Sequence, residues 1–336
     1  MLVLVNPFGG GGKAPRVWRT LQPLLEMGGV ECEVVTTTHA GHAREYVASL
    51  SLGVHSAVVT VSGDGLINEV LNGLLSRADA AEAIAALPLA PAPGGTGNSL
   101  HKSICHRAGE AHDLIATAFV ITKGSACRLD AWQYLTPASG DGATAEEHVM
   151  WSVLSFSWGV VADVDLESEV LRWCGPLRLT MYALMRIASL RRYSGTLEYQ
   201  DAASGEWVRI EGSDWVGFWA CNVAYMTQTD YAAPQAEFDN GHLDVLVLKG
   251  STRAQTLSMF LAMEEGKHIG GAGLSLVKAK AFRFYPQPRT PSKPGLLDVD
   301  GELVEPFGPI ECRPHPGGVR VLCPGPRAVR ASEEAV

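Results

Sequence analysis

The chain has 336 residues, of which 46% are hydrophobic and 19% are charged. This length indicates about two domains, each with its own core, and the composition excludes an intrinsically disordered chain and a disulfide-stapled miniprotein. The formal net charge of −9 argues against a general attraction to nucleic acid phosphates. We therefore expect a small-molecule partner and no nucleic acid.

The cysteines and the first residues indicate a cellular compartment. The seven cysteines are odd in number and contain no C-x-x-C pair, which argues against a disulfide framework and against a zinc site. Residues 1–7 have no basic region and form one short apolar run that ends at Pro7, so they predict a strand rather than a signal peptide. No run of about 18 apolar residues occurs in the sequence, so we expect a cytoplasmic protein without a membrane span.

The first part of the chain predicts an α/β domain. Short β-branched runs alternate with helical patterns through residues 2–125, which is typical of βαβ units and of a doubly wound parallel sheet. The expected elements are, in chain order, a strand at 2–5, a helix at 17–27, a strand at 33–37, a helix at 42–50, a strand at 57–61 and a helix at 66–75.

From residue 127 onward the pattern becomes rich in strands, which predicts a second domain. Strand-like runs lie at 151–157, 196–200, 207–211, 216–220, 243–248 and 281–285. Helical patterns lie at 176–192 and 252–265, and loops are expected at 138–147, 202–205 and 289–295. We divide the chain into an α/β domain at 1–126, a strand-rich domain at 127–318, and a final strand with a frayed tail at 319–336. The final strand can return to either domain.

Three glycine-rich segments each follow an expected strand and precede an expected helix. They lie at residues 6–14, 62–65 and 91–100. Backbone without side chains can wrap a phosphate, and a helix N-terminus favours the anion. Because the three segments share one topological position, they favour a polyphosphate nucleotide lying across successive turns at one edge of the sheet.

The first segment alone leaves another function open. It is not a Walker A loop, because Ala14 stands where a Ser or Thr would be needed. It does match G-x-G-x-x-[G/A] through Gly9, Gly11 and Ala14, and with Glu33 on the second strand this pattern permits a nicotinamide-dependent oxidoreductase.

The second segment holds an acidic residue at the sheet edge. In doubly wound folds ligands bind at the carboxyl ends of the strands, and the glycines beside Asp64 allow a substrate to approach closely. Capping of the helix expected near residue 66 explains Asp64 equally well from the residues alone.

Together these motifs resemble the catalytic domain of the diacylglycerol kinase type: Asn-Pro-x-Gly-Gly-x-Gly-Lys-Ala at 6–14, Ser-Gly-Asp-Gly-Leu at 62–66 and Pro-Gly-Gly-Thr-Gly-Asn at 93–98. Within that superfamily the chain is similar to the sphingosine kinases, through 62–66, 158–169 and 260–268, and the match runs from residue 2 to about 321. The resemblance implies an α/β nucleotide domain against an antiparallel β-sandwich lipid domain, with ATP and Mg²⁺ in the cleft. The implied reaction phosphorylates the primary hydroxyl of sphingosine or a related sphingoid base.

The resemblance also assigns roles to individual residues. Asp64 matches the general base, and Mg²⁺ would be carried mainly by ATP, with Asp64 or Glu302 as candidate ligands. Nucleotide contacts fall on Asn6, Pro7, Gly9, Gly10, Thr37, Ser62, Gly63, Gly65, Glu69, Gly94, Gly95, Thr96, Arg172, Arg178, Asp300, Gly301 and Glu302. Substrate contacts fall on Asp165 and Ser155 at the head group, and on Leu179, Met263 and His268 along the tail.

Some of these residues also have a simpler interpretation. Without the resemblance, His268 reads as a structural histidine and Asp300-Gly301 as a turn between strands. The helix at 176–192 reads as core, whereas in a lipid kinase Met181, Leu184 and Met185 would form a peripheral membrane contact.

Three other functions stay open at this point. A diacylglycerol or ceramide kinase would share the nucleotide motifs, but diacylglycerol has no ammonium to pair with Asp165. The NAD-dependent oxidoreductase would leave two glycine segments and Asp64 unused. A non-catalytic lipid sensor would bind the sphingoid base without nucleotide.

Overall fold

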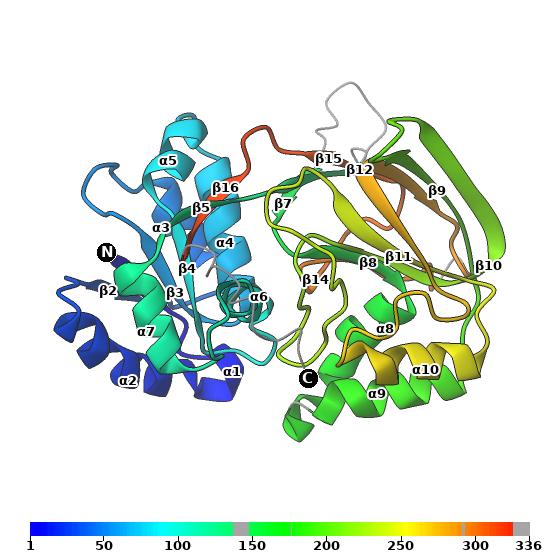
Figure 1. Cartoon of the computed structure of the whole chain (residues 1–336), viewed down its shortest axis with the longest axis horizontal. Coiled ribbons are helices and arrows are strands. Elements are labelled where there is room, and N and C mark those ends of the chain that lie inside the picture. Colours follow the sequence, from blue (N-terminus) through cyan, green and yellow to red (C-terminus); the bar gives the residue numbers. More distant parts are fainter. Residues whose placement is uncertain (137–147, 176, 291–292, 325–336) are drawn as a thin grey trace, which may run out of the picture.

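The computed structural model describes residues 1–136, 148–175, 177–290 and 293–324. The side chains of Arg172 and Trp173 also lie outside this description. The same holds for the loop predicted at 138–147, the tail beyond residue 324, and Pro176. The described chain forms two lobes that lie side by side (Figure 1).

The first lobe is built on a six-stranded sheet in the order β2-β1-β3-β4-β16-β5. The first four of these strands are parallel, and β16 runs parallel to β4 and antiparallel to β5. The strand bounds are β1 Leu2–Val5, β2 Glu33–Thr36, β3 Val58–Ser62, β4 Leu89–Pro93, β5 Ser125–Leu129 and β16 Val319–Cys323. The predicted doubly wound sheet is confirmed.

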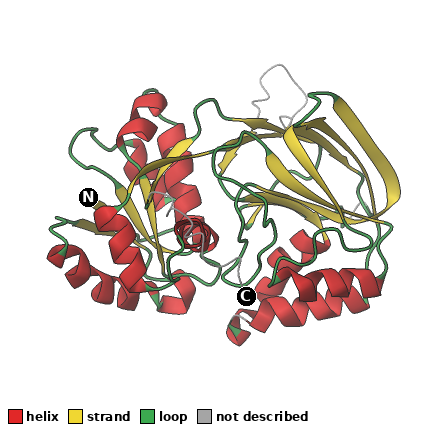
Figure 2. Ribbon diagram, viewed as in Figure 1, coloured by secondary structure: helices red, strands yellow, loops and turns green. Residues whose placement is uncertain are grey.

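Helices cover both faces of this sheet (Figure 2), so β1 and β3 are buried along their whole length, and β1 is apolar without alternation. The helices are α1 Gly9–Gly12, α2 Ala14–Met27, α3 His42–Ala48, α4 Asp64–Leu75, α5 Ala80–Ala86, α6 Ser99–Ala108 and α7 Leu114–Lys123. Two helices begin earlier than predicted. The helix expected from residue 17 begins at Ala14 because Pro15 fits its first turn, and the helix expected from 66 begins at Asp64.

The strand order places the glycine-rich segments where ligands bind in such folds. Because β1 lies between β2 and β3, the connections that leave β1 and β3 run in opposite directions along the sheet. Such a switch point opens a crevice outside the carboxyl ends of the two strands. Segments 6–14 and 62–65 begin at this crevice.

The second lobe consists of antiparallel strands that fold over one another. The long strands β10 and β12 each pair with β9 over one half and with β11 over the other, so both pass from one layer to the other. The strands are β6 Trp132–Thr136, β7 His148–Ser152, β8 Ser155–Gly159, β9 Tyr193–Asp201, β10 Trp207–Cys221, β11 Leu243–Lys249, β12 Ser275–Pro286, β13 Leu297–Val299, β14 Glu302–Leu303 and β15 Ile310–Pro314. The enclosed core is aromatic and includes Trp132, Phe156, Trp158, Trp215, Phe218, Phe282 and Phe284.

Two strand predictions in this lobe are corrected. The run at 151–157 is two strands, because the chain turns at Val153 and Leu154 between β7 and β8. The runs at 207–211 and 216–220 are one strand, β10, whose pairing register shifts between Gly212 and Gly217.

The remaining helices gather at one end of the second lobe (Figure 1). They are α8 Val160–Glu167, the 3₁₀ helix η1 Ser168–Cys174, α9 Leu177–Ala188 and α10 Arg253–Met263. A capping box starts α10: the Thr252 hydroxyl accepts from the Gln255 N–H, and the Gln255 side chain accepts from the Thr252 N–H. Among the described residues no helix has the length and apolar character needed to span a membrane.

The chain passes twice between the lobes. Strand β5 pairs in the first sheet as far as Leu129, and Trp132 opens the first strand of the second lobe. The predicted final strand, β16, returns to the first lobe and inserts between β4 and β5. The domain boundary at 126 and 127 stays a prediction.

Phe218→Ala should destabilise the protein by about 3–5 kcal/mol, because Phe218 is fully buried among the aromatic rings of the second lobe and its truncation leaves a cavity. Trp207 lies on the same strand but is 46% exposed, so Trp207→Ala should cost about 1 kcal/mol or less. Urea unfolding of both variants measures the difference. Equal losses would contradict this account of the core.

Candidate active site

A cavity of about 810 Å³ opens between the lobes and is lined by residues of both. The predicted residues in its lining are Asn6, Gly9, Gly10, Thr37, Ser62, Gly63, Asp64, Gly65, Glu69, Gly95, Thr96, Ser155, Asp165, Arg178, Leu179, Asp300, Gly301 and Glu302. Pro7, Gly94, Met263 and His268 are outside the lining, and the side chain of Arg172 is outside the described structure.

The three glycine-rich segments touch one another at the edge of the first sheet. A Cβ atom on Gly10 would lie 2.4 Å from the carbonyl oxygen of Gly94, and one on Gly95 would lie 2.2 Å from the Cα of Gly63. Gly10 also has a backbone φ of +59°, which residues other than glycine rarely adopt. Because a side chain at either position would push the segments apart, glycine is required for this contact.

Asp64 is the first residue of α4, and its carboxylate is held by a different helix. One oxygen accepts the Ser99 N–H at 2.9 Å and the other accepts the Leu100 N–H at 3.2 Å. These are the first two residues of α6, so Asp64 caps α6 rather than the helix it begins. Burial raises the pKa of Asp64, and the two backbone hydrogen bonds oppose this rise.

Asp165 on α8 faces a buried carboxyl group, Asp298 on β13. Burial and the neighbouring Asp165 charge raise the pKa of Asp298 well above its ordinary value, and burial also raises the pKa of Asp165. Asp298 is held in place because it accepts the Ser157 hydroxyl at 2.8 Å and the Gly301 N–H at 2.8 Å. Asp165, the residue predicted to bind the head group, therefore lies beside a second carboxyl group whose position is fixed by hydrogen bonds.

Asp300 is largely occupied by protein donors although it lines the cavity. It accepts the Ser152 hydroxyl at 2.5 Å, the Ser155 N–H at 3.0 Å and the Asn68 side-chain amide at 3.1 Å. Since Asn68 lies on α4, these bonds join the helix of Asp64 to the second lobe. Asp300 thus has a structural task here, and its contact with nucleotide stays a prediction.

Arg178 on α9 is paired with Glu169 on η1, and both line the cavity. The resemblance implies that Arg178 contacts the nucleotide phosphates. To do so, its guanidinium would have to leave the Glu169 carboxylate and pair with a phosphate oxygen. Glu169 was not predicted as a site residue, although it closes the acidic run at 158–169.

One wall of the cavity is apolar and comes mainly from α8, α9 and α10. Its residues are Val161, Val164, Leu166, Leu179, Ala183, Leu184, Ile187, Leu257, Phe260 and Leu261, with Trp219 and Met226 beside them. Of the three predicted tail contacts, only Leu179 belongs to this wall. The spacing of Leu257, Phe260 and Leu261 on one helix face is a sequence signal that could have found them.

Met263 and His268 lie outside the cavity lining, so their contact with the lipid tail stays a prediction. Met263 is buried within the main core, and the His268 Nε2 donates a hydrogen bond to the Ala232 carbonyl at 2.8 Å. His268 is 2% exposed, in agreement with the simpler interpretation of a structural histidine.

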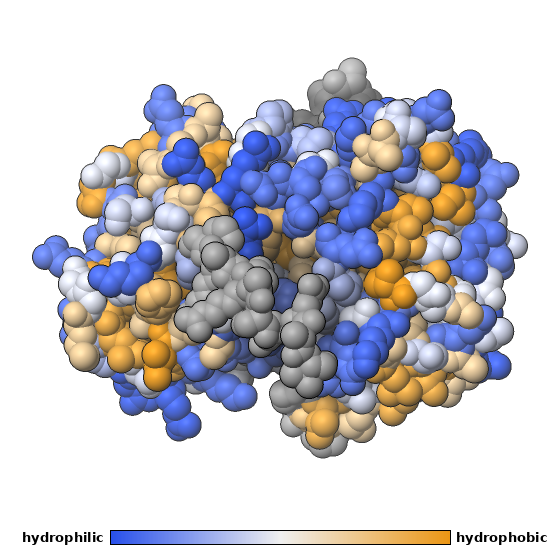
Figure 3. Space-filling model, in the orientation of Figure 1, coloured by the Kyte–Doolittle hydropathy of each residue, from blue (hydrophilic) through white to orange (hydrophobic). Residues whose placement is uncertain are grey.

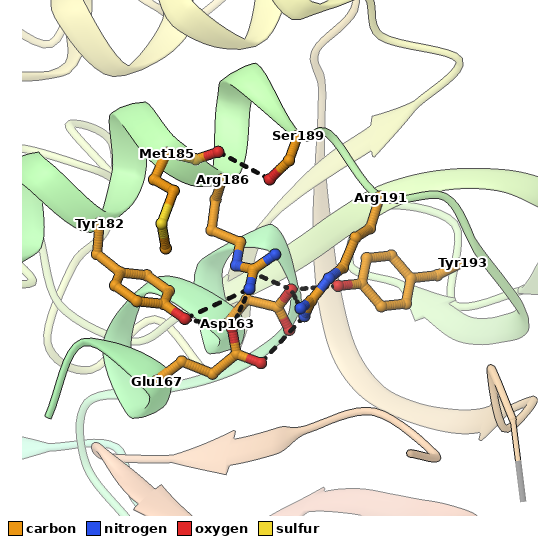
Figure 4. A network of polar contacts seen from close by, with 8 residues as sticks. All are labelled: Asp163, Glu167, Tyr182, Met185, Arg186, Ser189, Arg191 and Tyr193. Atoms are coloured by element: carbon orange, nitrogen blue, oxygen red, sulfur yellow. Dashed lines mark hydrogen bonds and ion pairs between the residues drawn. The ribbon is translucent and has the colours of Figure 1, made fainter. Parts of the chain in front are cut away.

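A charged network fixes α8, which carries Asp165, against α9 (Figure 4). The buried Asp163 carboxylate lies 2.7 Å from the Arg191 guanidinium and accepts the Tyr193 hydroxyl. Glu167 lies 2.7 Å from Arg186 and 3.0 Å from Arg191. These bonds bind one turn of α8 from two sides, so Asp165 has little freedom to move relative to the apolar wall.

Comparisons with known proteins agree with this arrangement. Residues 1–134 match the diacylglycerol kinase catalytic domain, and residues 154–323 match the YegS C-terminal NAD kinase beta sandwich-like domain. Sphingosine kinase 1 of Mus musculus is 33% identical to the chain over 359 residues, with 96% of this chain and 91% of that protein covered. The chain belongs to the sphingosine kinase family.

A plant member of the family shows the same identity to the chain. Sphingosine kinase 1 of Arabidopsis thaliana is 33% identical, covering 90% of this chain and 68% of that protein. A diacylglycerol kinase structure from Bacillus anthracis str. Sterne has a TM-score of 0.63 at 17% identity, covering 96% of both chains, and supports the fold. The predicted β-sandwich class of the second domain is confirmed.

Glu302→Gln should stabilise this family member at about pH 7.5 and have little effect at about pH 4. Partial desolvation of its carboxyl and repulsion from Glu69 and Asp300 raise the pKa of Glu302 above its ordinary value of 4.5, although the residue stays exposed. The folded state therefore binds the Glu302 proton more tightly than the unfolded state, so ionisation costs stability as the pH rises through the raised pKa. Below the ordinary value both states are protonated and the cost disappears.

Thermal melts of Glu302→Gln and the parent at the two pH values measure this effect. Glu206→Gln, in the turn before β10 and outside the cavity lining, serves as the control and should shift neither melt. A melting temperature that falls at about pH 7.5 would show that Glu302 is stabilised by a partner.

Proposed function

We propose that this protein is an ATP-dependent kinase that phosphorylates the primary hydroxyl of sphingosine or a related sphingoid base. One observation carries the proposal: Asp64 lies in a single cavity with the glycine-rich edge of the first sheet and an apolar wall from the second lobe. An anionic nucleotide and a lipid tail thus have separate places on either side of one carboxylate. Family membership supports the same reaction.

The nucleotide would bind at the glycine-rich segments of the first lobe. Gly10 and Gly63 present backbone without side chains at this edge, so phosphate oxygens can approach closely, while the Gly95 N–H is held by the Asn98 side chain at 2.9 Å. Thr37 at the end of β2 and Glu69 on α4 line the same part of the cavity, where we place the rest of the nucleotide.

Asp64 would take the proton of the lipid hydroxyl as that oxygen attacks the γ-phosphorus. The two backbone N–H groups of α6 fix the carboxylate and leave lone pairs on its oxygens for the incoming proton. In-line transfer of the phosphoryl group then depends mostly on positioning and on neutralisation of charge.

The lipid would enter with its head group at Asp165 and its tail along the apolar wall. The Asp165 carboxylate can pair with the ammonium of a sphingoid base, and Ser155 holds its hydroxyl 3.2 Å from the Trp219 indole N–H in the same wall. A lipid without an amine would leave the acidic pair of Asp165 and Asp298 without a cation.

Carboxylate oxygens are the ligands that Mg²⁺ prefers, and Asp64 and Glu302 would supply them at the phosphate edge. Bound there, Mg²⁺ would neutralise the charge of the transferred phosphoryl group. Within the described part of the chain no three carboxylates come together as a ready-made metal site. This arrangement favours an ion that arrives mainly with the nucleotide.

We also propose a cytoplasmic protein that contacts membranes peripherally at the mouth of the cavity. Large apolar residues are exposed on α9 and α10, and Figure 3 shows hydrophobic surface over these helices: Leu177, Met181, Leu184, Met185 and Leu261. Leu184 and Leu261 also line the cavity. These two residues link the exposed apolar side chains with the cavity, so a lipid could pass from a membrane into the cavity beside them.

Asp64→Asn should lower kcat by about 10²- to 10⁴-fold while ATP affinity changes little. The amide can still accept the Ser99 N–H, but it cannot take the proton of the hydroxyl. Asp113→Asn is a matched control, because Asp113 caps α7 in the same lobe through the Ala116 N–H and is outside the cavity lining. Turnover near that of the parent would remove Asp64 as the base.

Asp165→Asn should lower kcat/KM for sphingosine by about 10- to 100-fold, which corresponds to the loss of one charge-assisted hydrogen bond. Labelled ATP offered with sphingosine, ceramide or diacylglycerol measures this selectivity. Asp239→Asn, an exposed change on the second lobe, should leave the preference as it is. If the parent prefers diacylglycerol, or if Asp165→Asn affects all lipids equally, the head-group assignment fails.

A further inference from the structure

A second cluster of reactive side chains lies in the first lobe, where α6 connects to α7. His101 and Cys105 are four residues apart on α6 and so share one face of the helix, and His112 lies in the connection that follows. The Nδ1 atoms of His101 and His112 are 2.9 Å apart, and the Cys105 Sγ is 3.8 Å from the His101 Nδ1. None of the three lines the cavity of the proposed kinase.

This arrangement is mostly hidden from solvent. His101 is 3% exposed and Cys105 is 1% exposed, while His112 is half-buried and gives the cluster an opening. Among the described residues this is the one group of three His, Cys, Asp or Glu side chains whose ligand atoms all lie within 4.8 Å of each other. The cluster is therefore assembled before any ligand arrives.

The hydrogen bonds around His101 fix which ring nitrogen carries its proton. The Thr117 hydroxyl donates its single proton to the Asp113 carbonyl at 2.6 Å. The same oxygen lies 2.8 Å from the His101 Nε2, so it must accept the Nε2 proton. The His101 Nδ1 therefore presents a lone pair to His112, and the Cys105 Sγ lies beside the ring, 3.8 Å from Nδ1 and 3.7 Å from Nε2. One ring nitrogen fixed by a protein hydrogen bond and the other free to accept is typical of a metal-binding histidine.

We propose that His101, Cys105 and His112 bind one Zn²⁺ ion, with a solvent molecule as the fourth ligand. Two imidazole nitrogens and a thiolate suit zinc better than Mg²⁺ or Ca²⁺, which take oxygen ligands. Tetrahedral zinc with these bond lengths places its ligand atoms about 3.3–3.6 Å apart. The His101–His112 and His101–Cys105 separations of 2.9 and 3.8 Å are close to these values, and all three ligand atoms lie within 4.8 Å of one another.

Proton balance is simple for this site. Binding releases the Cys105 thiol proton to solvent as the zinc–sulfur bond forms. His112 donates from its Nδ1 to His101 before binding, so its proton moves to Nε2 as Nδ1 becomes a ligand. No oxidation or reduction takes place.

The place of the site in the fold gives it a structural task. Helix α6 begins with Ser99 and Leu100, which hold the Asp64 carboxylate, and His101 follows them directly. A bound ion would fasten the connection at His112 to this first turn of α6. The absence of a C-x-x-C pair, which argued against zinc in the sequence, does not apply to a histidine and a cysteine spaced four apart on a helix.

Zinc content of the full-length protein tests the proposal without nucleotide or lipid, so its outcome is independent of kinase activity. The protein is stripped with a chelator, given one equivalent of ZnCl₂, dialysed, and analysed by mass spectrometry for metal. We expect one zinc per chain and a rise in melting temperature of about 5 °C or more at saturating zinc.

The variants separate a metal site from a hydrogen-bonded cluster. Cys105→Ser and His112→Asn should each weaken zinc binding by about 100-fold or more, and Thr117→Val should weaken it by about 10- to 100-fold. The controls are His106→Asn, an exposed histidine on the same helix, and Cys32→Ser, a cysteine elsewhere in the lobe, and both should bind zinc like the parent. If Cys105→Ser does not fold, His112→Asn alone tests the zinc site, because His112 is half-buried and its replacement disturbs the core less.

Cobalt provides a direct test of the thiolate ligand. The Co²⁺-loaded parent should show the near-ultraviolet absorption of a thiolate bound to cobalt, and Cys105→Ser should lack it. A folded parent that retains no stoichiometric zinc would overturn the proposal. Zinc binding that survives both Cys105→Ser and His112→Asn would overturn it as well.

Discussion

The hydrogen bonds between the Asp64 carboxylate and the first turn of α6 are the constraint on which the site depends. An aspartate at the start of a helix ordinarily satisfies the N–H groups of that helix, but Asp64 satisfies those of Ser99 and Leu100. The third glycine-rich segment leads directly into α6, so the same two bonds fix the acid and the segment relative to each other. Burial raises the pKa of Asp64, and the N–H groups at the helix end oppose part of this rise.

Helix α4 extends this constraint to the rest of the molecule. Glu69, one and a half turns beyond Asp64, accepts the Ala43 N–H at 3.1 Å in the first turn of α3. Asn72 pairs with the backbone of Trp151 through both its amide oxygen and its amide nitrogen, at 2.9 and 3.0 Å, as a neighbouring strand would. One helix therefore caps two others and joins the second lobe, so the carboxylate and the lipid wall are positioned by shared elements.

The sequence predicted the features that depend on a local pattern of residues. It missed the features that depend on contacts between residues far apart in the chain. The unbroken apolar run Leu2–Val5 indicated a buried parallel strand, because that signal is contained in neighbouring residues. The glycine segments indicated one shared edge, because each stands between a strand pattern and a helix pattern. The same rule led to errors. The run at 151–157 mixes apolar residues with serines and contains no Gly, Pro, Asn or Asp, so no strong turn signal marked the turn at Val153. The partner of Asp64 lies 35 residues away on another helix.

The residues of α10 show that a local pattern also does not tell which helix face lines a cavity. Met263 has the apolar character that a lipid pocket needs, yet it lies on the core-facing side of α10, while Leu261 two residues earlier lines the cavity. Helix spacing fixes which residues share a face, but only the packing of α10 against α9 decides which face meets the lipid. A family motif can therefore point to the correct helix, and the burial of each residue must then separate the residues that hold the helix in place from those that meet the substrate.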